Sequence, residues 1–192
     1  MKVTKARATE NRRKLVHAAG RLFSRHGIGG VGVADIGNAA GLTHGAVYAR
    51  FPSKQALAAE ALADGTRQVV AVLRSCVANP AIGDYLDFSL CERSRDNLAG
   101  GCPLTATGSD VARQGKIVSR AFAEGFDELA VAIEEVLVDE ADYATARERA
   151  LAIAAAEIGT LIVARAVAKA DPAFSDEILA ASRRVLGEVG GE

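Results

Sequence analysis

With 192 residues, 49% of them apolar and none of them Trp, the chain can form one or two small domains with a sizeable core, and its alanine-rich composition favours helix over sheet. The net charge of −1 hides a split: residues 1–55 carry ten Lys and Arg against two acidic residues (+8), and residues 56–192 carry 13 basic and 22 acidic residues (−9). A basic part joined to an acidic part predicts that one end binds nucleic acid and the other does not.

Three further features narrow the class of protein. The cysteines Cys76, Cys91 and Cys102 form no CxxC pair, which argues against a disulfide framework and favours reduced thiols in the cytoplasm. No signal peptide is predicted, and the apolar run 150–168 is interrupted by Glu157 and Arg165, so we interpret it as a buried helix and not a membrane span. No metal-ligand spacing and no nucleophile motif occurs, so the sequence predicts no metal, no cofactor and no enzyme.

In chain order, residues 1–8 predict a disordered basic arm, and the first helix is expected from about Thr9 to His26. Residues 27–32 fit the pattern G-x-G-x-x-G. A dinucleotide site would need a preceding strand and an acidic residue ~20 positions further on, and neither is present. We therefore interpret residues 27–32 as a flexible loop between helices.

Residues 33–54, with the sequence VADIGNAAGLTHGAVYARFPSK, predict two short helices joined by a tight turn. Gly41 ends the first helix, because glycine readily adopts the left-handed conformation found at helix ends. Thr43 is expected to cap the second helix with its side-chain oxygen, Pro52 ends it, and Ser53 caps the next. This is the layout of a helix-turn-helix, in which residues 43–51 would be the recognition helix in the major groove.

The same stretch resembles the signature of the tetracycline-repressor (TetR) family. Matching positions are Asp35, Ile36, Gly41, Leu42, Thr43, Gly45, Val47, Tyr48, Phe51, Ser53 and Lys54. The resemblance implies an all-helical (all-α) dimeric transcription factor, with a helix-turn-helix DNA-binding domain at 1–55 and an effector-binding and dimerisation domain at 56–192. The chain departs from the family pattern where Val31 and Gly32 replace the usual Thr-Ser, and where Arg50 replaces a His.

The DNA contacts are expected from the recognition helix and the residue that follows its turn. Lys54 and Arg50 are the predicted phosphate anchors, and His44, Ala46 and Arg50 are the candidates for base edges. Tyr48 is either a phosphate hydrogen-bond donor or a packed aromatic. Gly45 would let the backbone approach DNA closely, although a merely tolerated glycine is the alternative. Thr43 completes the set at the start of the helix.

The remaining helices follow from apolar spacing and from turn residues. A long helix begins after Ser53 and ends at Asn79-Pro80, a shorter helix is expected around Asp84 to Arg93, and residues 97–103 form a loop whose Pro103 starts another helix. Residues 116–137 are strongly amphipathic, and residues 139–142 form an acidic turn. Two helices, about 142–170 and 172–187, complete the chain, with Asp171 as the cap of the last.

The resemblance implies that the middle helices enclose a small-molecule site and that the last two helices form the dimer interface. The predicted ligand site comprises Leu73, Phe88, Cys102, Phe122, Phe126, Ile158 and Arg165. Phe122 and Phe126 are as plausible in the core as in a ligand wall, and Glu157 and Arg165 would either meet a polar ligand group or pair with neighbouring helices or the other subunit. Leu161 and Ile178 are expected at the dimer interface.

These features predict a ligand-responsive, sequence-specific regulator, a repressor released from operator DNA by a small apolar molecule. The predicted partners are double-stranded DNA, that effector and a second copy of the chain, with no membrane. The alternative is a thiol-reactive sensor that uses Cys102, because a helix N-terminus lowers the pKa of a thiol. An inert, buried Cys102 is the ordinary expectation for a free cysteine.

Overall fold

The computed structural model describes residues 5–76, 82–137 and 143–191, and within these ranges all regular structure is α-helical, which confirms the predicted all-α class. The helices, in chain order, are α1 (Lys5–His26), α2 (Val33–Ala39), α3 (His44–Tyr48), α4 (Lys54–Cys76), α5 (Ile82–Ser89), α6 (Glu92–Asp96), α7 (Pro103–Val111), α8 (Lys116–Leu137), α9 (Tyr143–Val167) and α10 (Pro172–Gly190).

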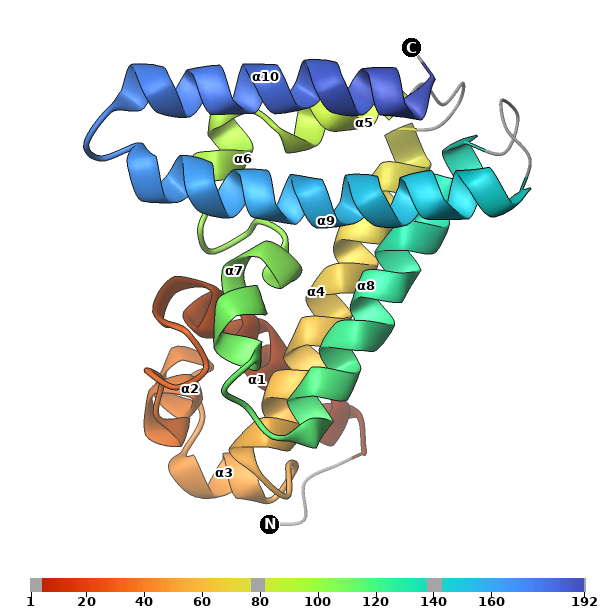
Figure 1. Ribbon diagram of the computed structural model, residues 1–192. Coiled ribbons are helices and arrows are strands. Elements are labelled where there is room, and N and C mark those ends of the chain that lie inside the picture. Colours follow the sequence, from red (N-terminus) through yellow and green to blue (C-terminus); the bar gives the residue numbers. More distant parts are fainter. Residues whose placement is uncertain (1–4, 77–81, 138–142, 192) are drawn as a thin grey trace.

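The molecule has two ends joined by two long helices (Figure 1). Helices α1, α2 and α3 lie at one end, and α9 and α10 lie side by side across the other. Helices α4 and α8 run next to each other between the two ends, so α4 begins in the basic part of the chain and reaches the acidic part. Its 23 residues span about 33 Å at a rise of 1.5 Å per residue.

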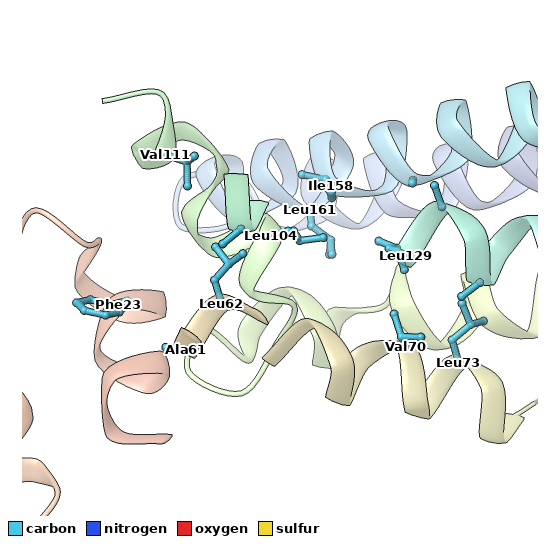
Figure 2. Close-up of a cluster of buried hydrophobic side chains, with 14 of the residues drawn as sticks. Phe23, Ala61, Leu62, Val70, Leu73, Leu104, Val111, Leu129, Ile158 and Leu161 are labelled. Carbon is cyan, nitrogen blue, oxygen red and sulfur yellow. The ribbon is translucent and has the colours of Figure 1, made fainter. Parts of the chain in front are cut away.

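The core is continuous from α1 to α9, as the side chains drawn in Figure 2 illustrate. Members labelled there include Phe23 of α1, Leu62 of α4, Leu104 of α7, Leu129 of α8 and Leu161 of α9. Most of these side chains are almost fully buried, and each such residue contributes roughly 1.5–3 kcal/mol through removal of apolar surface from water. Burial of this shared core therefore couples the basic end of the chain to the acidic end.

Helix α4 fits closely against two neighbours at consecutive residues. A methyl group on Gly65 would lie 3.1 Å from Cγ of Pro103 in α7, and a methyl group on Gly125 of α8 would lie 3.0 Å from Oγ1 of Thr66. The Thr66 hydroxyl is buried and donates to the Leu62 carbonyl oxygen at 3.0 Å, so it costs little to bury. These contacts hold α7 and α8 on two sides of α4.

Helix α9 is long and apolar enough to cross a membrane by length and composition. In the fold, however, it packs against α8 and α10, and Ala146, Ala150, Ile153 and Ala154 are fully buried. The alanines allow this close packing. We therefore describe α9 as a partly buried core helix.

Several predicted helix boundaries are confirmed and others are corrected. Residues 116–137 form α8 as expected, Pro103 is the first residue of α7, and Asp171 caps α10 by accepting a hydrogen bond from the Phe174 N–H at 3.0 Å. Helix α1 begins at Lys5, four residues before the predicted start. The predicted helix at 84–93 is two helices, α5 and α6. The predicted Asn79-Pro80 helix end and the acidic turn at 139–142 lie outside the described residues.

Candidate functional site

The turn between α2 and α3 has the backbone geometry of a helix-turn-helix. Gly41 has a φ of +66°, and the N–H of Leu42 donates to the Gly37 carbonyl oxygen at 2.8 Å, which closes the end of α2. A methyl group on Gly37 would lie 3.1 Å from the Leu42 carbonyl oxygen, so the chain crosses itself closely here. This tight crossing fixes the angle at which α3 leaves α2.

The caps of this unit agree only partly with the expectation. Ser53 caps α4, because its Oγ accepts a hydrogen bond from the Ala56 N–H at 3.1 Å. Thr43 occupies the N-cap position of α3, but the prediction that its side chain caps the helix was wrong: no such hydrogen bond forms, and the residue is exposed. The side chain of Thr43 therefore faces solvent at the start of α3.

The outer surface of α3 is exposed and carries small and aromatic side chains. His44 and Tyr48 form an edge-on ring pair with centroids 5.1 Å apart, and Tyr48 is 52% exposed. Gly45 lies between them along the helix, and a methyl group there would meet no atom within 4 Å. The fold itself thus does not require glycine at position 45, which is consistent with a surface shaped for close approach by another molecule. Ala46 is half-buried beside it.

Arg50 and Lys54, unlike the other predicted DNA contacts, have side chains that donate hydrogen bonds to backbone carbonyl oxygens. The Arg50 guanidinium donates to the Ala46 carbonyl oxygen at 3.0 Å, and its Nε is buried without a partner. Lys54 Nζ donates to the Val31 carbonyl oxygen at 2.8 Å and so links the start of α4 to the loop before α2. An ammonium group has three donors, so Lys54 retains two for a phosphate.

We expect Lys54→Ala to weaken binding to all DNA sequences alike and to lower the slope of log affinity against log salt by about one, because each phosphate contact releases a counterion. Fluorescence anisotropy with operator and random DNA at several salt concentrations measures both effects. Lys54→Gln, which removes the charge and keeps a donor for Val31, separates loss of the phosphate contact from loss of the internal hydrogen bond. A changed sequence preference at an unchanged slope would contradict the phosphate role.

A second candidate site is a cavity of about 570 Å³ at the junction of the two parts. Its walls come from α1, α4, α5, the segment 91–102, the start of α7, and α9. The apolar side chains in the wall include Val69, Val72, Phe88 and Leu161. A cavity of this size suits a small organic molecule.

Of the seven predicted ligand-site residues, Phe88 and Cys102 line this cavity, and Leu73, Phe122, Phe126, Ile158 and Arg165 do not. Leu73 and Ile158 belong to the buried core. The Phe122 ring lies against Gly108 of α7, and Phe126 also packs against the core. Arg165 donates to the carbonyl oxygens of Ser94 (3.1 Å) and Arg95 (2.9 Å), so it holds α6 in place.

The cavity contains residues that apolar spacing did not identify. His17 and Arg21 come from α1, which the sequence assigns to the DNA-binding part, and Tyr85 lies on α5. No local pattern identifies them, because the wall forms only when helices distant in the sequence pack together. The interrupting charge of Glu157 in an apolar run was the one usable signal.

Glu157 is the buried carboxyl group of the cavity wall. It is 2% exposed, and the Tyr85 hydroxyl donates to its Oε2 at 2.6 Å. Burial raises the pKa of Glu157 to about 7, despite the opposing effect of the hydrogen bond from Tyr85. The same burial, together with the negative charge of Glu157, raises the pKa of Tyr85.

Cys102 occupies the N-cap position of α7, as expected. The expectation that this position lowers the pKa of its thiol was wrong: burial and the nearby Glu157 raise the pKa to about 11. The thiol is therefore protonated at neutral pH, and its reactivity as a nucleophile is correspondingly low.

An exposed short helix held at a fixed angle by a glycine turn, in a module of net positive charge, defines a DNA-binding protein of the helix-turn-helix class. Comparison with known proteins agrees. The family described as "Bacterial regulatory proteins, tetR family" matches residues 15–61. The HTH-type transcriptional regulator AcrR of Shigella flexneri is 40% identical over 57 residues, which is 30% of this chain and 26% of that protein.

Solved structures extend the likeness to the whole fold. The reduced form of NemR from E. coli is 17% identical with a TM-score of 0.76, over 92% of this chain and 94% of that one. A TetR-family regulator from Agrobacterium tumefaciens is 19% identical with a TM-score of 0.76, over 94% and 97% of the two chains. Residues 15–61 therefore carry the DNA-binding domain of the TetR family of transcriptional regulators, and the whole chain has the fold of a TetR-family structure.

Proposed function

We propose that this protein is a cytoplasmic homodimeric repressor that leaves its operator when a small molecule fills the cavity. The observation that carries the proposal is the composition of the cavity wall, because α1 and α4 contribute to the wall and also reach the helix-turn-helix unit. A ligand that fits one position of these helices better than another shifts the equilibrium between DNA-binding and released states. On this proposal residues 1–55 bind DNA, and residues 56–192 dimerise and, together with α1, bind the effector.

The operator contacts follow from the exposed surface of α3. Thr43, His44, Gly45 and Tyr48 are exposed there, and a two-fold dimer would place two copies of α3 in successive major grooves about 34–36 Å apart. A near-palindromic operator is the expected target. Selection of bound fragments from random DNA, followed by footprinting, tests this directly, and a selected site with no two-fold symmetry would contradict the dimeric arrangement.

The dimer surface is assigned to the outer faces of α9 and α10. Exposed small and apolar residues recur there at helical spacing: Ala152, Ala155, Ile162, Val163 and Ala166 on α9, and Phe174, Ala180, Ala181 and Val185 on α10. Ile178 is half-buried beside this face. The expectation that Leu161 lies at the interface was wrong, because its side chain is 3% exposed within one subunit and lines the cavity.

A hydrogen-bonded clasp supplies a second route between the cavity and the DNA-binding unit. Asp110, near the end of α7, accepts hydrogen bonds from the N–H groups of Ile28 (2.5 Å) and Gly29 (3.2 Å) in the loop between α1 and α2. The other end of α7 begins with Pro103 at the cavity wall. Helix α7 therefore links the cavity to the loop that precedes the helix-turn-helix.

We expect the Asp110→Ala variant to bind effector as the wild type does but to release operator incompletely. The reason is that a movement of α7 would no longer be transmitted to the loop between α1 and α2. Loss of two hydrogen bonds to a carboxylate also costs about 1–3 kcal/mol of stability. Titration of operator release by anisotropy gives the coupling, and thermal unfolding gives the stability. Arg113→Ala is the matched control, because it removes a donor to the Asp110 carboxylate and leaves Asp110 itself in place. Equal release by Asp110→Ala and the wild type would exclude the clasp from the mechanism.

A further inference from the structure

The cavity places one buried carboxyl group in a largely apolar wall. Glu157 accepts a hydrogen bond from Tyr85, and among residues 5–76, 82–137 and 143–191 no Lys, Arg or His forms an ion pair with it. Removal of an ionised carboxylate from water without a cationic partner is costly, so such groups are normally paired. This carboxyl group is therefore a site at which a positive charge would be stabilised.

The cations of this region are already used or lie at the surface. The guanidinium of Arg165, two helical turns along α9 from Glu157, donates hydrogen bonds to the carbonyl oxygens of Ser94 and Arg95. Arg95 is bound to Asp96, Ser175 and Asp176. Arg21 and Arg93 also line the cavity but are exposed to solvent. Glu157 is thus the buried charge that a bound molecule would meet.

We propose that the effector is a small organic cation: an apolar or aromatic body that carries one positively charged nitrogen. The nitrogen would lie beside Glu157 and Tyr85, and the body would contact Val69, Phe88 and Leu161 in the same wall. This inference rests on the proposed function and narrows the expected effector from an apolar molecule to an amphipathic cation. The cavity volume of about 570 Å³ accommodates a molecule of this kind.

Binding of a permanent cation is expected to depend on pH. A quaternary ammonium ion pairs with the ionised form of Glu157, so its affinity falls as pH drops below about 7 and is constant above it. Other titratable or charged groups in the wall are His17, Arg21, Asp64, Asp87, Cys91, Arg93, Tyr85 and Cys102. The pKa values of Tyr85 and Cys102 are raised away from this range. The His17→Gln variant is the control that shows whether His17 contributes to the pH dependence of binding.

Because the chain contains no Trp, one introduced Trp can report ligand binding without fluorescence from any other Trp. Phe88→Trp would place a single fluorophore in the cavity wall. In this background the probes are benzyltrimethylammonium and tetraphenylphosphonium, with neopentylbenzene as the neutral isostere of the first. We expect the cations to change Trp fluorescence, the isostere to bind at least about tenfold more weakly, and Glu157→Gln to weaken cation binding about 10–100-fold.

Glu157→Gln is also expected to fold, and its stability checks the buried carboxyl group independently. The folded-state pKa of about 7 lies above the ordinary 4.5, so the folded wild type loses stability as pH rises from about 4.5 to 7. The glutamine removes this loss. The Tm of Glu157→Gln should therefore exceed that of the wild type by roughly 10 °C at pH 8 and match it near pH 4.5.

The outcomes separate this inference from the proposed function. The inference is overturned if neither cation binds, if neopentylbenzene binds as well as benzyltrimethylammonium, or if Glu157→Gln binds the cations unchanged. If neutral compounds release operator and cations do not, the proposed function stands and the inference fails. If the cations bind at Glu157 but leave operator affinity unchanged, the cavity binds cations and the proposed ligand-responsive function fails.

Discussion

Val163→Glu is expected to convert the dimer to monomers and to lower operator affinity by roughly 100-fold or more, because a monomer loses the advantage of binding two half-sites at once. Val163 is 49% exposed on the outer face of α9, so glutamate there should not disturb the fold of one subunit. At the proposed interface, however, two-fold symmetry brings like charges together in a desolvated surface. Sedimentation at micromolar concentration and anisotropy with operator DNA measure the two effects.

Val131→Glu is the matched control for this substitution, because Val131 is an exposed valine on α8, outside the proposed interface. It should remain dimeric and bind operator normally. Val185→Glu, on α10, should reproduce the effect of Val163→Glu. A wild-type protein that sediments as a monomer, or a dimeric Val163→Glu variant, would reject the α9–α10 interface.

Phe51→Ala is expected to cost about 3–5 kcal/mol and to abolish operator binding by unfolding the DNA-binding module. Phe51 is 2% exposed, and the Arg12 guanidinium lies 4.3 Å from the centre of its ring. Arg12 also donates to the Arg50 carbonyl oxygen at 2.8 Å and pairs with Glu60. Loss of the ring thus leaves a cavity and removes the surface on which Arg12 packs.

Thermal unfolding followed by circular dichroism, together with operator binding at 10 °C and 37 °C, tests this expectation. Phe51→Leu keeps most of the buried volume and should lose less stability. Arg12→Ala isolates the contribution of the cation above the ring. A Phe51→Ala variant with wild-type Tm would show that the aromatic residue is not a core element of the module.

The sequence was sufficient for the features that depend on neighbouring residues. Gly41 signals a left-handed helix end, Asp171 and Pro172 signal a helix start, and residues 116–137 show helical spacing on one face. Each of these signals acts within one or two turns of backbone. The helix-turn-helix was accessible for the same reason, and its resemblance to the TetR family signature implied the all-α fold class.

The break between α5 and α6 shows where a local reading fails. The apolar pattern of residues 84–93 continues through the break, but Cys91 is extended, and the side chains of Cys91 and Ser94 both donate to the Phe88 carbonyl oxygen. Short polar side chains of this kind compete with the helix for backbone groups. The pattern of apolar residues does not reveal whether the helix continues or the side-chain hydrogen bonds end it.

The cavity could not be predicted from local sequence patterns, because its wall combines α1, α4, α5 and α9, which are distant in the sequence. Helical spacing shows that Phe122 and Phe126 face inward, but it does not reveal whether they meet a ligand or the core. Arg165 illustrates the same limit for charge: its partners are carbonyl oxygens 70 and 71 residues away in the sequence. Only tertiary packing distinguishes these possibilities.

The two close contacts of α4 have a consequence for anyone who wishes to build biosensors from this scaffold. Gly65 faces Pro103, and Thr66 faces Gly125, so a side chain added at either glycine would require its neighbour to shift by a few tenths of an ångström. A library that randomises either glycine therefore alters the packing of α4 against α7 or α8. Diversity for new analytes is better placed at Gln68, Val72 and Phe88, which line the cavity and are exposed, so their replacement leaves the helix contacts intact.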